Sequence, residues 1–156
     1  MKDPALQSPH LPVEILLVED DPADVRLVKE FLTQDKPHHH IHVVSTGEEA
    51  LAFVHHKGNH ARAPRPDLIL LDLNLPLVDG RETLACLKVD NKFKSIPVIV
   101  FSSSRTPHDV SKVYDLYANA YIVKPRTLEE YRRVMTLIEE FWLKTAQLPT
   151  LQAPQP

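Results

Sequence analysis

The sequence holds a single cysteine, Cys86, and no apolar run that approaches the length of a membrane-spanning helix. One cysteine cannot form an internal disulfide, and a spanning helix needs about 20 apolar residues. The segment 1–12 also lacks the apolar stretch of a secretory signal. We therefore predict a cytoplasmic protein with no membrane partner.

The sequence also lacks a strong excess of either charge, since 18 basic and 21 acidic residues give a formal net charge of −3. Such a chain has no broad electrostatic attraction for nucleic acid, and no basic face or helix-turn-helix is evident. Nucleic acid is therefore not expected as a direct partner. A length of 156 residues with 43% hydrophobic residues suffices for one core. We predict one domain over 13–147, flanked by proline-containing tails at 1–12 and 148–156.

Five short apolar runs alternate with segments of helical spacing. The runs are 14–18, 41–44, 68–71, 98–101 and 121–123. Three of them contain the stretches ILLV, LILL and VIVF, which are apolar at every position, as strands covered on both faces must be. Strands that alternate with helices in this way predict an α/β fold with a doubly wound parallel sheet.

Helix starts are marked by capping residues. Asp21 precedes a proline at the first helical position, and the pairs Thr46 with Glu49 and Thr127 with Glu130 have the spacing of capping boxes. Two further helices are expected over 81–89 and about 108–117. Each run expected to form a strand is thus followed by a helix.

Polar side chains directly follow the apolar runs. Ligands of open α/β sheets bind outside the carboxyl ends of the strands, so these residues are expected to share one edge of the sheet. Carboxylates grouped there repel one another unless a hard cation joins them, and Mg²⁺ suits a site with few carboxylates. The residues are Glu19, Asp20 and Asp21 after the first run, Asp72 after the third, Ser102, Ser103 and Ser104 after the fourth, and Lys124 after the fifth.

Four motifs resemble those of response-regulator receiver domains: VEDD at 18–21, LLDLNLPLVDG at 70–80, PVIVFSSS at 97–104 and YIVKP at 121–125. The resemblance covers roughly 13–145. It implies a five-stranded flavodoxin-like receiver fold with strand order 2-1-3-4-5 over 13–147. It also implies a signalling domain and not an enzyme, with self-phosphorylation and autodephosphorylation as its only chemistry.

The resemblance gives each site residue a role. Asp72 is expected to be the phosphoacceptor. Glu19 and Asp20, with Asp72 and the backbone carbonyl of Asn74, are expected to hold Mg²⁺. Lys124 is expected to pair with Asp72 and then with a phosphoryl oxygen, while Asp21 is expected to cap the first helix.

Ser102 and Tyr121 match the switch positions of the family. The Ser102 hydroxyl is expected to turn toward the phosphoryl group, and the Tyr121 ring to move inward as it does so. The family also carries a cis peptide bond after its lysine, here Lys124-Pro125. Two departures concern the output surface: Asn119-Ala120 stands where a Gly-Ala pair is common, and Arg126 replaces an aromatic residue.

The last expected helix carries more apolar surface than packing on one sheet requires. We therefore predict a homodimer or partner surface there, continuous with helix four and strand five. Its residues are Tyr131, Met135, Phe141 and Trp142. The segments FWLKTAQLP at 141–149 and LILLDLNLP at 68–76 resemble single-domain response regulators of cyanobacterial and bacterial phytochromes, which implies a histidine-kinase photoreceptor as phosphodonor. No effector domain is expected after 147, so output is expected through association or onward phosphorelay.

Two other classes of protein remain open. A Mg²⁺-dependent phosphohydrolase with an aspartyl-phosphate intermediate also uses Asp, Lys and Ser on a parallel sheet, but it would need an Asp where Asn74 stands. A pseudo-receiver would share the fold and serve only as a docking module. The histidines at 38–40 and 42 are expected to line a loop and strand entry without forming a metal site, and Cys86 is expected to be a buried or half-buried structural thiol.

Overall fold

The computed structural model describes residues 12–33 and 39–149. The tails expected at 1–12 and 148–156 lie almost wholly outside these residues, as does His38. Within the described part of the chain, no helix is long and apolar enough to cross a membrane.

Strands and helices alternate along the chain as the sequence predicts. The strands are β1 (Glu14–Val18), β2 (His40–Val44), β3 (Leu68–Leu71), β4 (Val98–Ser102) and β5 (Ala120–Val123). The helices are α1 (Pro22–Leu32), α2 (Gly47–Val54), η2 (Gly58–His60), α3 (Gly80–Val89), α4 (Pro107–Asp115), α5 (Leu128–Ile138) and η3 (Glu139–Thr145), the last of which is a π-helical continuation of α5.

All neighbouring strands pair in parallel, and the sheet has the order β2-β1-β3-β4-β5. This arrangement confirms the predicted doubly wound α/β fold and its strand order. The reversal of strand order lies between β1 and β3, where the register pairs Val18 with Leu71. The residues that follow these two strands therefore emerge side by side at the carboxyl edge of the sheet.

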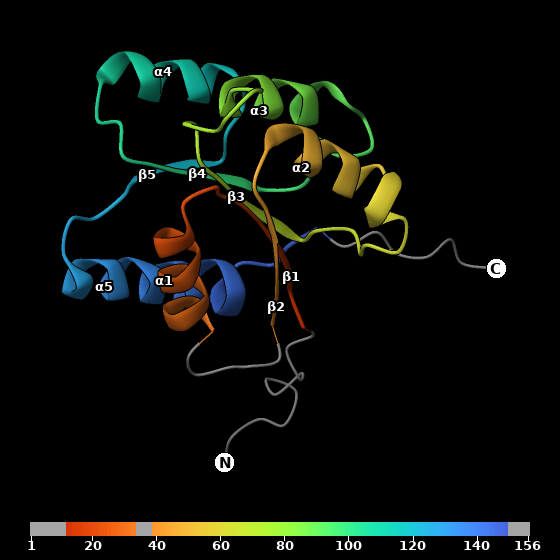
Figure 1. Cartoon of the computed structure of the whole chain (residues 1–156). Helices are drawn as coiled ribbons and strands as arrows, with labels where there is room; N and C mark the ends of the chain where they lie inside the picture. Colours follow the sequence, from red (N-terminus) through yellow and green to blue (C-terminus); the bar gives the residue numbers. More distant parts are fainter. Residues whose placement is uncertain (1–11, 34–38, 150–156) are drawn as a thin grey trace.

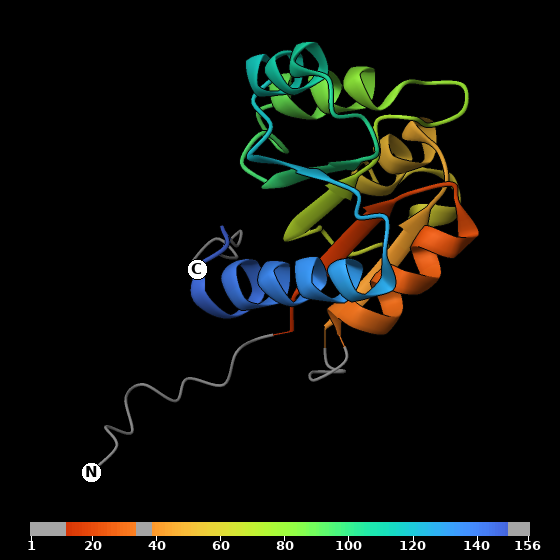
Figure 2. The same cartoon turned by 90° about the vertical axis from the view of Figure 1, so that its left-hand side faces the viewer.

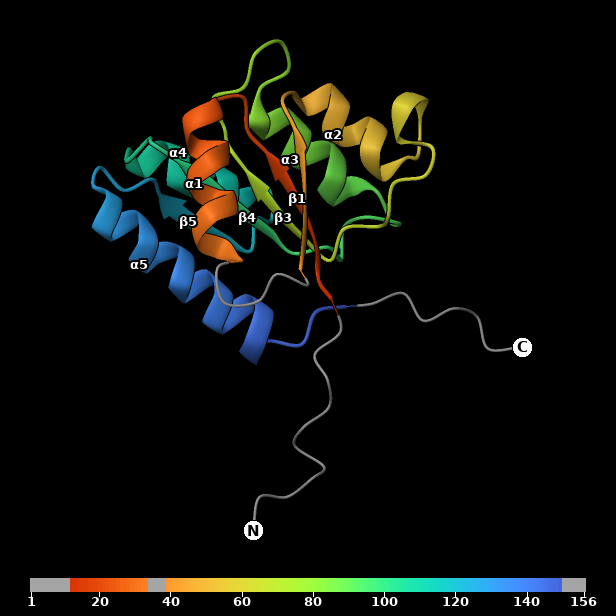
Figure 3. The ribbon, with the colours of Figure 1, turned by 60° about the horizontal axis from the view of Figure 1, so that its bottom comes forward.

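The sheet lies between two layers of helices, with α2, α3 and α4 on one face and α1 and α5 on the other (Figures 1 and 2). Each face has its own apolar cluster: Leu16 and Ile69 belong to the first, while Ile15 and Leu70 belong to the second. Alternate residues of a strand point to opposite faces, which is why the central strands must be apolar throughout. Figure 3 shows α1 lying beside α5 on their shared face.

The helix starts follow the capping signals in the sequence. Asp21 accepts a hydrogen bond from the Ala23 amide at 2.8 Å, and Thr46 and Thr127 accept from the third residue of their helices. Thr106 caps α4 in the same way, with Pro107 in its first turn. Each capping oxygen pairs with an amide that has no partner inside its helix, so the cap fixes where the helix begins.

The predicted partner surface on α5 is wrong for two of its four residues. Tyr131 and Met135 are 3% and 0% exposed, because they face the sheet and pack in the second apolar cluster, where the Tyr131 ring meets Phe101 edge to face at 5.5 Å. Phe141 is 54% exposed and Trp142 is half-buried. The helix is amphipathic, and the sequence alone did not show which part of its wide apolar face meets the sheet.

Two smaller expectations also need correction. Cys86 is exposed, because it lies on the outer side of α3, whereas Leu84 and Leu87 on either side of it face the core. Leu148, placed in the tail by the sequence, is half-buried and packs against the second apolar cluster. The packed domain therefore extends at least to this residue.

Candidate functional site

The carboxyl ends of β1, β3 and β5 bring together residues that are more than fifty positions apart in the sequence. Glu19 and Asp20 follow β1, Asp72 follows β3 and Lys124 follows β5. The ammonium Nζ of Lys124 lies 3.0 Å from Glu19 Oε2 and 3.0 Å from Asp72 Oδ2. The predicted grouping of these side chains at one edge of the sheet is therefore present.

Glu19, Asp20 and Asp72 form an acidic cluster in which one ligand oxygen of each lies within 4.8 Å of the others. Glu19 and Asp72 are buried, whereas Asp20 is exposed. Burial and the charge of Asp72 raise the pKa of Glu19 to about 7, even though Lys124 opposes this change. Two close buried carboxylates disfavour each other's ionised form, so this cluster favours an added cation.

Lys124 is the one cation that contacts this acidic cluster among the described residues, and its side chain is 12% exposed. Burial alone would lower its pKa, but hydrogen bonds to Asp24, Glu19 and Asp72 raise it instead. The lysine therefore remains an ammonium at neutral pH. A fixed positive charge beside Asp72 can stabilise negative charge that arrives there.

Asp24 is the site residue that the sequence reasoning missed. Its Oδ2 lies 2.8 Å from Lys124 Nζ, and its Oδ1 accepts a hydrogen bond from the Tyr131 hydroxyl at 3.2 Å. Burial, followed by the charge of Asp24, raises the pKa of Tyr131, so the tyrosine stays a donor. Asp24 lies in the first turn of α1. No local pattern in the sequence marks its contact with Lys124.

Backbone groups of the loop after β3 fix the position of Asp72. The Asn74 amide donates to Asp72 Oδ1 at 3.2 Å, and the Gly80 amide donates to the Leu73 carbonyl at 3.0 Å. A Cβ on Gly80 would lie 2.3 Å from the Asp72 carbonyl oxygen and 2.7 Å from Leu73 Cα. Only glycine permits this close approach, so the start of α3 fixes the position of the Asp72 backbone.

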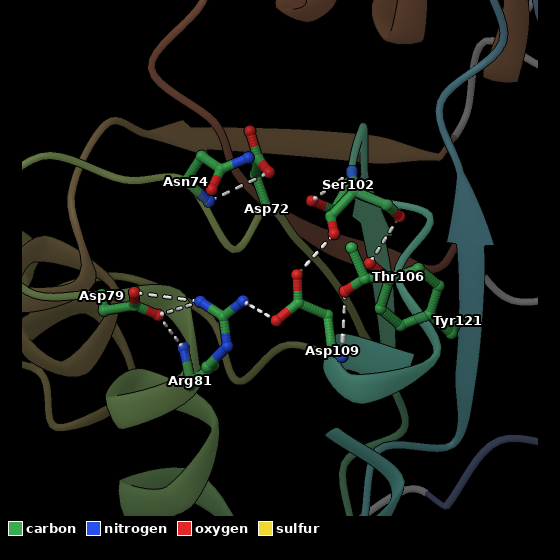
Figure 4. A network of polar contacts seen from close by, with 9 residues as sticks. Asp72, Asn74, Asp79, Arg81, Ser102, Thr106, Asp109 and Tyr121 are labelled. Carbon is green, nitrogen blue, oxygen red and sulfur yellow. Dashed lines mark hydrogen bonds and ion pairs between the residues drawn. The ribbon is translucent and has the colours of Figure 1, made fainter. Parts of the chain in front are cut away.

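Ser102 ends β4 and is fully buried, and its hydroxyl accepts a long hydrogen bond of 3.5 Å from the Ser104 amide. Within the part of the chain that the structure describes, no hydrogen bond joins Ser102 to Asp72, and the close-up shows none between them (Figure 4). The Tyr121 hydroxyl donates to the Ser104 carbonyl at 2.8 Å, and its ring packs against the first apolar cluster. The tyrosine ring thus lies inward, against the loop between β4 and α4.

The Lys124–Pro125 peptide bond is trans, as no cis bond occurs among the described residues. The expectation of a cis bond is therefore wrong for this structure. A trans bond is the ordinary state before proline, and the Lys124 ammonium reaches its three carboxylates with the chain in this form.

The donor set fits a small divalent cation. Carboxylate oxygens are hard ligands, and this edge holds four carboxylates, from Glu19, Asp20, Asp24 and Asp72, of which all but Asp20 contact the single ammonium of Lys124. The negative charge in excess of that ammonium lies at an edge where one carboxylate, Asp20, is open to solvent. Mg²⁺ and Mn²⁺ both suit such oxygen ligands.

The fold and this site together define a class: a single doubly wound α/β domain with an acidic, lysine-containing edge at its topological switch point. Residues 15–136 match the family model described as the response regulator receiver domain. The chain belongs to the response-regulator receiver family. Receiver domains are signalling domains and not classical enzymes, and they bind a divalent metal in their acidic pocket.

Several relatives are similar over nearly the whole chain. Response regulator Rcp1 of Synechocystis sp. is 45% identical over 138 residues, which cover 88% of this chain and 94% of Rcp1. The phosphorylated cyanobacterial phytochrome response regulator RcpA has a TM-score of 0.86 at 47% identity, covering 89% of this chain and 99% of RcpA. The Mn²⁺-bound form of Rcp1 has a TM-score of 0.85 at 45% identity, covering 89% of this chain and all of that structure. This chain is therefore closely related to phytochrome response regulators.

Proposed function

We propose that this protein is a phosphorylatable response regulator in which Asp72 accepts a phosphoryl group from a histidine kinase. The observation that carries the proposal is the contact of Lys124 Nζ with Asp72 Oδ2 at 3.0 Å beside the buried Glu19. A carboxylate is a weak nucleophile, and it needs fixed positive charge to accept an anionic group. This edge of the sheet supplies that charge on a lysine that does not titrate near neutral pH.

The proposed step transfers a phosphoryl group from a histidine of the donor to Asp72. A carboxylate oxygen of Asp72 forms a bond to phosphorus as the bond between phosphorus and the donor imidazole nitrogen breaks, and the electron pair of that bond returns to the imidazole. Lys124 stays on the phosphoryl oxygens and stabilises their charge. Glu19, Asp20, Asp72 and the backbone carbonyl of Asn74 would hold Mg²⁺. When bound, this cation neutralises charge on the phosphoryl oxygens.

The proposed response follows from the loop after β4. Once Asp72 carries a phosphoryl group, the Ser102 hydroxyl turns toward it and donates to it, and the loop after β4 follows, which favours the inward position of the Tyr121 ring against the Ser104 carbonyl. This rearrangement changes the surface of α4, β5 and α5. Phosphorylation then acts as a local charge change with a wider structural effect.

The donor is proposed to be a phytochrome histidine kinase, as the names of the related RcpA and of the bacteriophytochrome response regulator RtBRR suggest. A groove between α1 and β2 opens beside Glu19 and Asp20, and Arg26 and Lys29 line it together with the apolar Val25. Such a mixed surface can accept a kinase helix next to the acceptor. Homodimerisation through the surface of α4, β5 and α5 remains part of the proposal, as does a cytoplasmic location.

Labelling with acetyl phosphate and Mg²⁺, followed by intact-mass measurement, tests the proposal. The native protein should gain one phosphoryl group per chain, and Asp72→Asn should gain none. Lys124→Ala should permit some labelling, but its conformational response should be reduced, because the positive charge that couples to the phosphoryl group is missing. Equal labelling of the native protein and the Asn variant would contradict the assignment of Asp72. Release of many equivalents of phosphate per chain would indicate a phosphohydrolase instead.

A further inference from the structure

A charged bridge spans the two loops that flank the proposed phosphorylation site. Arg81, in the first turn of α3, directs Nη2 to Asp109 Oδ1 at 2.5 Å, while its Nη1 contacts the Asp79 carboxylate at 3.0 and 3.1 Å. The other carboxylate oxygen of Asp109 accepts a hydrogen bond from the Ser104 hydroxyl. Asp109 in α4 therefore joins the loop after β3 to the loop after β4 (Figure 4).

Ser104 is the point at which this bridge meets the switch residues. Its hydroxyl donates to Asp109, its amide donates to the Ser102 hydroxyl at 3.5 Å, and its carbonyl accepts from the Tyr121 hydroxyl at 2.8 Å. These contacts use three different groups of one residue. A shift of Ser104 must therefore affect both Ser102 and Tyr121.

The bridge is partly buried and stays charged. The side chains of Arg81 and Asp109 are 21% and 20% exposed. Hydrogen bonds from Ser104 and Arg81 lower the pKa of Asp109 to about 2, so its carboxylate remains ionised at neutral pH. Charge-assisted hydrogen bonds in this setting are shorter and stronger than neutral ones.

We infer that Arg81 and Asp109 are positioning residues, which hold Ser104 where Tyr121 lies inward and Ser102 can turn toward Asp72. The inference rests on the proposed function, because it assigns these residues an effect on phosphoryl acceptance. Neither residue contacts Asp72, and both act through Ser104. The bridge thereby favours the arrangement proposed for the phosphorylated protein, in which Tyr121 lies inward and Ser102 faces Asp72.

The direction of the effect follows from linkage. A phosphoryl mimic on Asp72 favours the state with Tyr121 inward, so any contact that stabilises this state also strengthens binding of the mimic. Removing the bridge should lower the population of that state in the unbound protein. The apparent affinity for the mimic then falls by the same factor.

The test is calorimetric titration with beryllofluoride in the presence of Mg²⁺, using Asp109→Asn, Ser104→Ala and the double variant. Each single variant should bind roughly three- to tenfold more weakly than the native protein, a range typical of coupled neighbours. The double variant should bind no more weakly than either single one, because both remove the same link. Arg81→Lys, which keeps a donor for Asp109, should restore most of the native affinity.

Arg105→Ala is the matched control. Arg105 is next to Ser104 in the same loop and is exposed, and no ion pair with it is found in the described residues, so its loss should leave the affinity unchanged. A purely structural role of the bridge would lower the free energy of unfolding in urea and leave the affinity alone.

The inference is overturned if Asp109→Asn and Ser104→Ala bind beryllofluoride as the native protein does, or if their effects simply add. Should Asp109→Asn fail to fold, Ser104→Ala decides, because it lies outside every helix. A native protein that binds no more beryllofluoride than Asp72→Asn would contradict the proposed function and this inference together. Native binding that depends on Asp72 and is unchanged in the bridge variants would contradict the inference alone.

Discussion

At the scale of single residues, the sequence was informative where chemistry directly follows an apolar run. Glu19, Asp72 and Lys124 could be placed together because parallel strands end at one edge of the sheet. Asp24 could not, because an acidic residue in the first turn of a helix is usually explained by the helix dipole. Its second role depends on the position of α1 against β5, which the local sequence does not specify.

Asn119 is a second residue whose role could not be predicted from the local sequence. At a position where the family commonly has glycine, its side-chain oxygen accepts from the Val98 amide at 2.9 Å and from Lys88 Nζ at 3.0 Å. Lys88 also donates to the backbone carbonyls of Lys94 and Ile96, and burial lowers the pKa of its ammonium. Asn119 therefore ties the start of β4 to the end of α3, a contact between distant segments that no local pattern indicates.

We expect Asn119→Ala to lower the free energy of unfolding by about 1–3 kcal/mol, because the change leaves the Val98 amide without a partner. Urea denaturation measures this difference. Asn59→Ala is the control, since Asn59 is exposed in η2, and it should change stability little. Equal losses in the two variants would show that the Asn119 contacts contribute nothing specific.

At the scale of elements, the existence and type of every strand and main helix were predicted, and the errors lie at their ends. Helix α4 was expected to reach residue 117, yet it ends at Asp115. Tyr117 takes a left-handed backbone conformation with φ of 69°, which terminates helices. Glycine is the usual residue there, so a tyrosine gives no such signal in the sequence.

Strand β2 illustrates how charge supports an edge strand. Its His40 and His42 contact the carboxylate of Glu14 in β1, at 2.9 Å and 2.6 Å. Burial alone would raise the pKa of Glu14, but the hydrogen bonds from the two histidines lower it below its ordinary value of 4.5. His40 and His42, which were expected at the entry of this strand, thus have a structural partner.

Glu14→Gln should lower the free energy of unfolding by about 0.5–1 kcal/mol near pH 6. A carboxyl group whose pKa is lowered on folding adds stability above its unfolded pKa, and this stability is lost as the pH falls through the folded pKa. The difference between native and variant should therefore shrink below pH 4.5, the ordinary pKa of Glu14. Denaturation curves across this range provide the check, with the exposed Glu48→Gln as control. A difference that persists unchanged at low pH would contradict the pairing.

At the scale of the whole molecule, the sequence predicted the fold and the edge of the sheet that carries the site. It did not predict which apolar side chains stay exposed on the surface. Leu137 at the end of α5 and Phe141 in η3 are 52% and 54% exposed, and Tyr114 in α4 and Tyr117 just after it are 47% and 75% exposed. Large apolar side chains that stay exposed are candidates for a partner surface. The proposed dimer surface therefore shifts from Tyr131 and Met135 to these outward residues.

Phe141→Glu should weaken self-association of the native protein at least tenfold, because it places a charge on this apolar surface. Light scattering over a range of concentrations measures the effect, with and without phosphodonor. Val89→Glu is the control, since Val89 is 80% exposed at the end of α3, away from α5. A native protein that stays monomeric at all concentrations, phosphorylated or not, would exclude the dimer.

The proposed function depends most on which residue is phosphorylated, and borohydride trapping tests this directly. Borohydride reduces an acyl phosphate on aspartate to homoserine, with release of phosphate, and peptide mass spectrometry then locates the reduced residue. After treatment with acetyl phosphate and Mg²⁺, we predict homoserine at position 72 and at no other carboxylate of the cluster. Reduction at Glu19, Asp20 or Asp24, or none at all in a protein that carries phosphate, would contradict the account.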